Sequence, residues 1–295
     1  GGYNGKPILW DAQTLQSLVT LTDKNIVSID DVKFIPGKNQ LIISGCGEWQ
    51  GAYCQKHEVI IWDTETYEKV HSFRSHGNSH FDYSVLRISV NPAGTLLATG
   101  TNEIILWDLS TYEEIATLEN NPLFGSDELF ISMEFSSDGK IIATGNCNKR
   151  PSFLAKCIEG KIALWDLETY TLIGEPLINH TDYIRSLSFS PDGQHLISGS
   201  EDNTVIFWDL ELRQPLSNPI TIHADWIRAI KFSKDGNFMI TSSDDRTLFK
   251  WPGNPESWMT VACERAGRNL TQEEWQIFFP DDDYRKTCEQ WFEGY

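Results

Sequence analysis

Two sets of residues in the second half of the chain combine a histidine, a hydroxyl and a carboxylate, which are the groups of a hydrolase triad. Each set has the same spacing and ends at a tryptophan: His180, Ser198, Asp202 and Trp208 in one, and His223, Thr241, Asp245 and Trp251 in the other. A tryptophan N–H only donates a hydrogen bond, and buried polar groups need partners whether or not they react. Because the set recurs, we expect two structural hydrogen-bond networks and no enzyme.

Six short apolar segments, each ending in a tryptophan, divide the chain into repeats. They read PILWD, VIIWD, IILWD, IALWD, VIFWD and LFKWP, and their tryptophans are Trp10, Trp62, Trp107, Trp165, Trp208 and Trp251. Successive tryptophans lie 52, 45, 58, 43 and 43 residues apart. A period of this length indicates one supersecondary unit copied in tandem.

Each repeat has the pattern of four antiparallel strands. An alternating segment that ends in a turn comes first, as in RSLSFSPDG (185–193) and RAIKFSKDG (228–236). A second strand such as LISGS follows, and the tryptophan strand is third. A turn of the form WDxxTY then leads to a weaker fourth strand. Four strands in about 43 residues, repeated along the chain, are typical of a propeller blade.

These units resemble WD repeats over residues 1 to about 262. The resemblance implies an all-β WD-repeat β-propeller: five complete four-stranded blades and one partial N-terminal blade of a propeller with seven or more blades, then a short helical C-terminal tail. The expected divisions are 1–24 for the partial blade, 25–74, 75–119, 120–179, 180–222 and 223–266 for blades 2 to 6, and 267–295 for the tail. In WD repeats, the histidine–hydroxyl–carboxylate–tryptophan set pins adjacent strands and loops together.

Other repeats depart from this set. The second and fourth have no histidine ahead of the first strand, and the third has His80 as a candidate but lacks the aspartate. We expect these blades to be held less tightly.

The repeats also differ in their loops, and function is expected in what is not copied. The loop between the second and third strands is long in repeats two and four, and the segment that leads to the next blade is longer after repeats two and three. In an antiparallel blade these loops share one end, so they lie on one face over blades 2 to 4. In WD repeats this face frequently binds partners. The candidate partner-binding residues are Trp49, Tyr53, His57, Lys149, Arg150, Phe153 and Lys156.

Exposed aromatic side chains near arginine are enriched at interface hot spots, which favours the binding role. The alternative is that Trp49 and Phe153 fold back and cover their own loops.

Each long loop contains a cysteine pair, Cys46 with Cys54 and Cys147 with Cys157. The pattern leaves three alternatives: free buried thiols, a disulfide across each hairpin, or a metal site to which His57 contributes. No CxxC spacing is present, and a reducing cytosol keeps thiols reduced, so free cysteines are expected. We expect no cofactor and no metal.

The charge and hydropathy of the chain disfavour some classes of binding partner. The 295 residues carry a formal net charge of −18 with acidic residues spread along the chain, which disfavours nucleic acid. No apolar run reaches the length of a membrane span, and no leader pattern opens the chain, so no membrane partner and a cytoplasmic location are expected.

The C-terminal run ACERAGRNLTQEEW followed by YRKTC is similar to the ending of large bacterial multidomain proteins, many of them cyanobacterial. These place an effector domain and a signal-transduction NTPase of the NACHT or NB-ARC type before a C-terminal WD-repeat sensor. The resemblance implies a ligand-sensing or autoinhibitory module whose partners include upstream domains of the same polypeptide. No GxxxxGK[ST] motif occurs in this segment. The alternative is a free-standing WD-repeat scaffold.

Two expectations concern the ends of the chain. Only nine residues precede Trp10, which leaves no room for two strands, so we expect a C-terminal fragment of a longer protein. Thr271 and Glu274 have capping-box spacing, so a short helix is expected from Thr271 through Phe278. Trp275, Phe279 and Trp291 are expected to hold this tail against the propeller.

Overall fold

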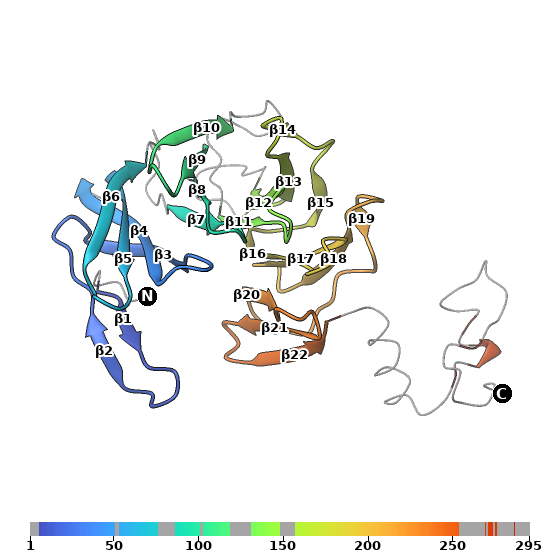
Figure 1. Ribbon diagram of the computed structural model, residues 1–295. Helices are drawn as coiled ribbons and strands as arrows, with labels where there is room; N and C mark the ends of the chain where they lie inside the picture. The colour runs from blue at the N-terminus through green and yellow to red at the C-terminus, as the bar shows by residue number, and fades with distance from the viewer. Residues whose placement is uncertain are drawn as a thin grey trace.

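The computed structural model describes residues 6–50, 53–75, 86–100, 103–118, 131–147 and 157–253, and in the C-terminal region residues 269, 271–273, 275 and 286. Within these ranges the chain forms 22 β-strands in six antiparallel sheets. The sheets follow one another in chain order around a common axis (Figure 1). We refer to them as blades 1 to 6.

Three blades have four strands in simple meander order. Blade 2 contains β3 (Ser28–Phe34), β4 (Gln40–Gln50), β5 (Tyr53–Asp63) and β6 (Lys69–Ser75). Blade 3 contains β7 (Arg87–Val90), β8 (Leu96–Gly100), β9 (Ile104–Asp108) and β10 (Glu114–Leu118). Blade 5 contains β16 (Ile184–Phe189), β17 (His195–Ser200), β18 (Val205–Asp209) and β19 (Gln214–Pro215).

The other blades vary this plan. Blade 4 contains β11 (Ser132–Phe135), β12 (Ile141–Cys147), β13 (Gly160–Asp166) and β14 (Thr171–Leu172), and β15 (Leu177–His180) also pairs with β13. Blade 1 is the hairpin of β1 (Ile8–Trp10) and β2 (Ser17–Thr20), and blade 6 contains β20 (Ile227–Phe232), β21 (Phe238–Ser243) and β22 (Leu248–Pro252). The fourth strand expected for blade 6 falls on SWMTVA, outside the described residues.

The WDxxTY turn has a local cause that recurs in the blades. After the tryptophan strand of blade 2, Oδ1 of Asp63 accepts hydrogen bonds from the backbone N–H groups of Glu65 and Thr66, each at 2.8 Å. The last residue of the turn, Tyr67, has a φ of 59°, in the left-handed region. Asp166 makes the same two bonds in blade 4. The aspartate therefore fixes the reversal into the fourth strand.

The turn between the first and second strands fixes the contact between blades. In blade 3, Gly94 has a φ of 68°, and a Cβ there would lie 2.3 Å from the carbonyl oxygen of Pro36 in blade 2. Only glycine fits this position, because both the backbone conformation and the close approach exclude a side chain.

The hydrophobic core lies between the blades. Five clusters of buried side chains each join two consecutive blades, and the tryptophan strands supply much of them. Trp107, Trp165 and Trp208 are at most 5% exposed, whereas Trp10 of blade 1 is 58% exposed. Full burial of one such side chain contributes roughly 2 to 3 kcal/mol, so each tryptophan stabilises its blade against a neighbour.

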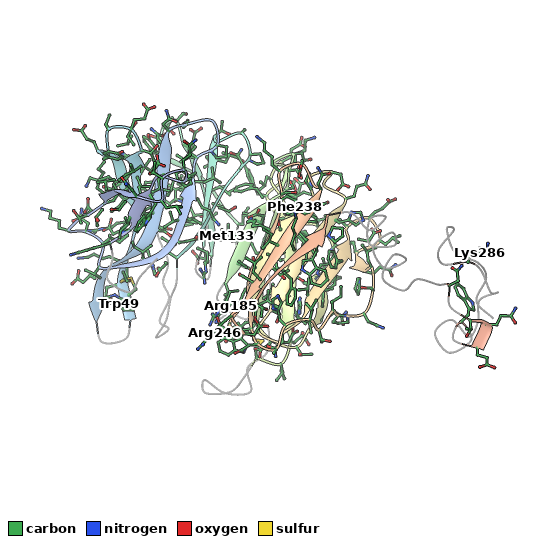
Figure 2. All side chains as sticks on the ribbon, turned by 90° about the horizontal axis from the view of Figure 1, so that it is seen from below. Trp49, Met133, Arg185, Phe238, Arg246 and Lys286 are labelled. Atoms are coloured by element: carbon green, nitrogen blue, oxygen red, sulfur yellow. A yellow bond between two sulfur atoms is a disulfide. The ribbon has the colours of Figure 1, made fainter. Side chains whose placement is uncertain are left out.

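The tail forms one helical turn in its described part. Gln272 and Glu273 are helical, and the N–H of Trp275 donates to the carbonyl of Thr271 at 2.8 Å. The helix therefore starts where the capping pattern predicts. Lys286 lies apart from the blades (Figure 2). Phe279 and Trp291 lie outside the described residues, and docking of the tail stays a prediction. Within the described residues, no helix has the length and apolar character to cross a bilayer.

Candidate functional site

The histidine of each hydrogen-bond network comes from the segment that links two blades. His180 ends β15, which pairs with β13 of blade 4, and its imidazole reaches into blade 5. In the same way, Ile220 bridges to Val205 of blade 5, and His223 three residues later reaches blade 6. Each network therefore joins consecutive blades.

In blade 5 the contacts form a chain from the tryptophan to the carboxylate. The indole N–H of Trp208 donates to Oγ of Ser198 at 2.8 Å, and this oxygen lies 2.7 Å from Nε2 of His180. Nδ1 of His180 lies 2.8 Å from Oδ2 of Asp202. One donor direction satisfies every group: the hydroxyl donates to Nε2, and Nδ1–H donates to the carboxylate.

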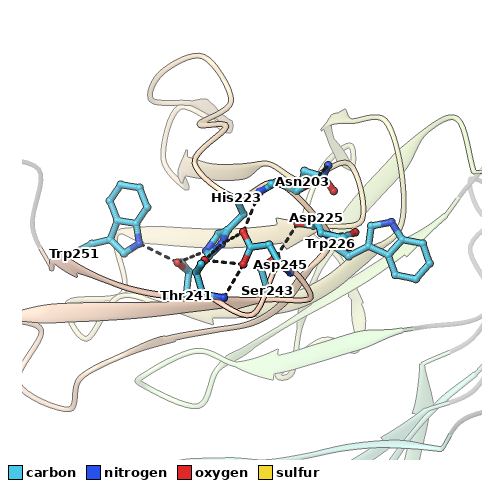
Figure 3. A network of polar contacts seen from close by, with 10 residues as sticks. Asn203, His223, Asp225, Trp226, Thr241, Ser243, Asp245 and Trp251 are labelled. Carbon is cyan, nitrogen blue, oxygen red and sulfur yellow. Dashed lines mark hydrogen bonds and ion pairs between the residues drawn. The ribbon is translucent and has the colours of Figure 1, made fainter.

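Blade 6 repeats this chain with threonine in place of serine (Figure 3). Trp251 donates to Oγ1 of Thr241 at 3.0 Å, and this oxygen lies 2.8 Å from Nε2 of His223. Nδ1 of His223 lies 3.0 Å from Oδ2 of Asp245. The network continues to the backbone N–H of Asp245, which donates to Ser243 at 3.1 Å.

These networks have the hydrogen-bond contacts of a hydrolase triad, but a substrate has no access to the hydroxyl. Ser198 is fully buried and His180 is 2% exposed, so no substrate carbonyl can reach the hydroxyl. The oxygen of Ser198 also accepts from Trp208, which holds it in the core. Burial opposes ionisation of Asp202, but hydrogen bonds from His180 and Thr204 outweigh it and lower the pKa of this carboxyl to about 2. A permanent carboxylate acceptor is what a structural network requires.

Blades 3 and 4 retain one part of the network, the hydrogen bond from the tryptophan to the hydroxyl of the second strand. Trp107 donates to Oγ1 of Thr99 at 2.9 Å, and Trp165 donates to Oγ1 of Thr144 at 3.0 Å. In blade 3 the place of the histidine is taken by Ser75, whose Oγ lies 2.8 Å from that of Thr99. The sequence candidate His80 lies outside the described residues.

The long loop of blade 2 is a strand hairpin rather than a loop. β4 and β5 continue to Gln50 and Tyr53, and Trp49 pairs with Cys54 across the two strands. Trp49 is 42% exposed near the tip. Glu48 and Lys56 form an ion pair beside it. The hairpin therefore presents a large aromatic side chain beyond the body of the blade.

The two ends of the blades differ in what they carry. Trp49, Arg185 and Arg246 lie toward one side of the molecule, and Phe238 lies toward the other (Figure 2). We call the side with Trp49 the hairpin face. The second strands β4 and β12 both end on this side, so the hairpin of blade 2 and the described base of the insertion in blade 4, at Cys147 and Cys157, belong to this face.

The other candidate binding residues have different outcomes. His57 is 3% exposed on β5, and burial lowers its pKa to about 4, so the expectation that it contacts a partner is wrong. The side chain of Tyr53 and all of Lys149, Arg150, Phe153 and Lys156 lie outside the described residues. Of the seven candidates, the structure describes Trp49 at the surface.

Both cysteine pairs form disulfides, and the expectation of free thiols is wrong. Cys46 bonds to Cys54, and Cys147 bonds to Cys157, with Cα–Cα distances of 5.7 and 5.9 Å. Each disulfide closes the base of a long loop on the hairpin face. The four sulfur-bearing residues are at most 6% exposed. Within the described ranges, no group of three histidine, cysteine or acidic residues is arranged to hold a metal.

Two arginine units on the hairpin face do not follow from the repeat pattern alone. In blade 6, Arg228 pairs with Asp244 through two hydrogen bonds and lies over the ring of Trp226, 5.1 Å from its centre. In blade 5, Arg185 pairs with Glu201 and lies 5.7 Å from the ring centre of Tyr183. The signal that could have indicated them is the pair of parallel segments YIRS with SED, and WIRA with SDD. Arginine stacked on an aromatic ring is a typical interface anchor.

Comparison with known protein families agrees with this architecture. Residues 171–209 and 214–251 match the WD40 family, described as WD domain, G-beta repeat. These segments run from β14 to β18 and from β19 into β22. The chain thus contains two WD40 repeats within an all-β fold of propeller blades. WD40 domains generally act as protein-interaction scaffolds and are typically non-catalytic. No curated protein matches the chain.

Proposed function

We propose that the protein is a non-catalytic interaction propeller that binds a protein partner through its hairpin face. The observation that carries this proposal is the β4–β5 hairpin, which exposes Trp49 beyond the blade and is closed at its base by a disulfide. A tryptophan has only two side-chain torsions, and the disulfide restrains the backbone that carries Trp49, so this residue suits a hot spot. The arginine–aromatic units of blades 5 and 6 extend the same face.

We further propose that this propeller is the C-terminal sensor or autoinhibitory module of a bacterial signalling NTPase in the cytoplasm, with upstream NTPase and effector domains as partners. Support for this narrower role comes from the tail motif alone. A free-standing scaffold that assembles a multiprotein complex is the second candidate, and the WD40 matches favour it equally. The upstream reading frame discriminates between them, because a scaffold requires no NTPase.

The binding face is tested by comparing two exposed aromatic residues at opposite ends of blade 2. Trp49 lies in the hairpin, and Phe34, which is 64% exposed, ends β3 at the other end. Purification of the tagged protein from its native cells, with quantitative mass spectrometry, should show a partner that Trp49→Ala loses and Phe34→Ala retains. Equal recovery with both variants would refute the assignment of the face.

A further inference from the structure

Charged side chains of the innermost strands meet near the axis of the blades. The first strands β3, β7, β11, β16 and β20 lie innermost (Figure 1). Glu134 of β11 and Lys231 of β20 form an ion pair although β16 of blade 5 lies between their blades in the series. An ion pair that skips a blade shows that inner-strand side chains reach toward the common axis.

Arg87 of β7 is the cation without a partner in this group. Its Nε is buried and makes no hydrogen bond, and its guanidinium makes no ion pair within the described part of the chain. Burial lowers its pKa. The charges that act on it come from three other inner strands: Asp30, Asp31, Arg185 and Arg228.

The nearby carboxylates already have other donors. Oδ2 of Asp30 accepts from the backbone N–H of Leu86 at 2.9 Å, and Oδ1 of Asp31 accepts from that of Val32 at 2.8 Å. Glu201 and Asp244 pair with the two other arginines. A guanidinium has five N–H donors, and a buried donor without a partner is costly. Arg87 therefore has unused hydrogen-bonding capacity at its buried Nε.

The positions equivalent to Arg87 in the following blades are small. Arg87 pairs with Gly100, the residue after the second-strand hydroxyl. In blades 4, 5 and 6 the residues in this register are Ser132, Ser186 and Ala229. In blades 5 and 6 the residue directly before this position is an arginine at a bulge, Arg185 or Arg228, and each of these arginines has its own carboxylate partner.

We propose that Arg87 receives a carboxylate of the partner polypeptide, an aspartate or glutamate side chain inserted along the axis. The proposal rests on the interaction role proposed above and names the group that is recognised. The planar guanidinium matches a carboxylate through two parallel hydrogen bonds. A single negative charge fits better than a phosphate dianion, because Asp30 and Asp31 stand beside the site and the whole chain carries −18.

The test is thermal unfolding with defined probes at constant ionic strength: the neutral-capped peptide acetyl-Gly-Glu-Gly-amide, its glutamine counterpart, acetate and inorganic phosphate. The glutamate peptide at about tenfold its dissociation constant should raise the Tm by about 2 to 4 °C, and the glutamine peptide should not. Arg87→Gln should abolish the response and Arg87→Lys should reduce it. Arg74→Gln is the matched control, since Arg74 is an exposed arginine paired with Glu58.

Three outcomes would overturn the proposal: an equal response in Arg87→Gln, a larger response to phosphate than to the glutamate peptide, or a response to acetate alone. The last would assign the site to a small carboxylic acid instead of a protein. If Arg87→Gln does not fold, Arg87→Lys decides alone. Partner recovery that depends on Trp49 would survive a failure at Arg87, so the two proposals fail separately.

Discussion

The hydroxyl of Ser198 lies 2.7 Å from the imidazole of His180, and the two residues belong to different blades. Each of the two residues has a further partner: Trp208 donates to the hydroxyl oxygen, and Asp202 accepts from the imidazole. An arrangement that elsewhere activates a nucleophile here fastens two sheets together. Burial, and not the identity of the residues, decides between the two roles.

Removing the central hydroxyl should therefore lower stability strongly. Ser198→Ala leaves the N–H of Trp208 and Nε2 of His180 without partners in the core. We expect a loss of about 2 to 4 kcal/mol in the free energy of unfolding, measured by urea denaturation. Ser217→Ala, at an exposed serine that bonds only to the next carbonyl, should change it by less than about 0.5 kcal/mol. A similar small change for Ser198→Ala would contradict the network's structural role.

Asp30 should make stability depend on pH. Burial raises its pKa to about 6, against the hydrogen bond from Leu86 and the charge of Arg87. The folded protein therefore holds this proton more tightly than the unfolded chain, and stability from this group falls as pH rises from about 4 to about 6. Asp30→Asn keeps an acceptor for Leu86 and removes the charge. Its free energy of unfolding should exceed that of the wild type by up to about 3 kcal/mol at pH 7.5, and the two proteins should be equally stable near pH 4.

The measurement is urea denaturation of both proteins at the two pH values. Glu211→Gln serves as the control, because Glu211 is exposed and makes no side-chain hydrogen bond or ion pair in the described part of the chain. Its free energy of unfolding should equal that of the wild type at both pH values. A stabilisation by Asp30→Asn that is equal at both pH values would show that packing, and not charge, is responsible.

The features that repeat could be predicted from the sequence. The tryptophan strands are short apolar runs that recur in the sequence, and the WDxxTY turns are held by hydrogen bonds within the turn, so local patterns indicate both. Both histidine networks also follow a fixed spacing, although His180 and Ser198 lie in different sheets. The coarse architecture and these contacts are therefore predictable from the order and spacing of the residues.

The features of the hairpin face depend on geometry that one repeat does not contain. Between Cys46 and Trp49 the pairing of β4 with β5 shifts register twice, and Cys46 and Cys54 bond across this irregular stretch although they are not register partners. Sequence periodicity does not reveal these irregularities, and the absence of a CxxC spacing together with the expectation of a reducing cytosol favours free thiols. Whether Arg87 finds an ion-pair partner depends on residues of the inner strands of three other blades, so no pattern in its own repeat could predict it.

The disulfides should be present in the purified protein. Its intact mass under non-reducing conditions should be about 4 Da below the reduced mass, two hydrogens for each disulfide. Replacing both Cys46 and Cys54 with serine should cost about 2 to 3 kcal/mol, as expected for closing a short loop. It should also weaken partner recovery as Trp49→Ala does. Free thiols in protein alkylated directly in its native cells would place it in a reducing compartment, whereas intact disulfides would indicate an oxidising one.

The two arginine units should differ in their contribution to stability despite their parallel construction. The side chain of Glu201 is 6% exposed and that of Asp244 is 39% exposed. Arg185→Ala leaves a buried carboxylate without its cation, so we expect a loss of about 2 to 4 kcal/mol. Arg228→Ala breaks a solvated pair, and the expected loss is below about 1 kcal/mol. Urea denaturation of both variants measures the difference.

Adding Glu201→Gln to Arg185→Ala should restore most of the lost stability, because it removes the unpaired charge. Equal losses for the two single variants, or no recovery in the double variant, would show that stacking of the arginines on Tyr183 and Trp226 outweighs the ion pairs.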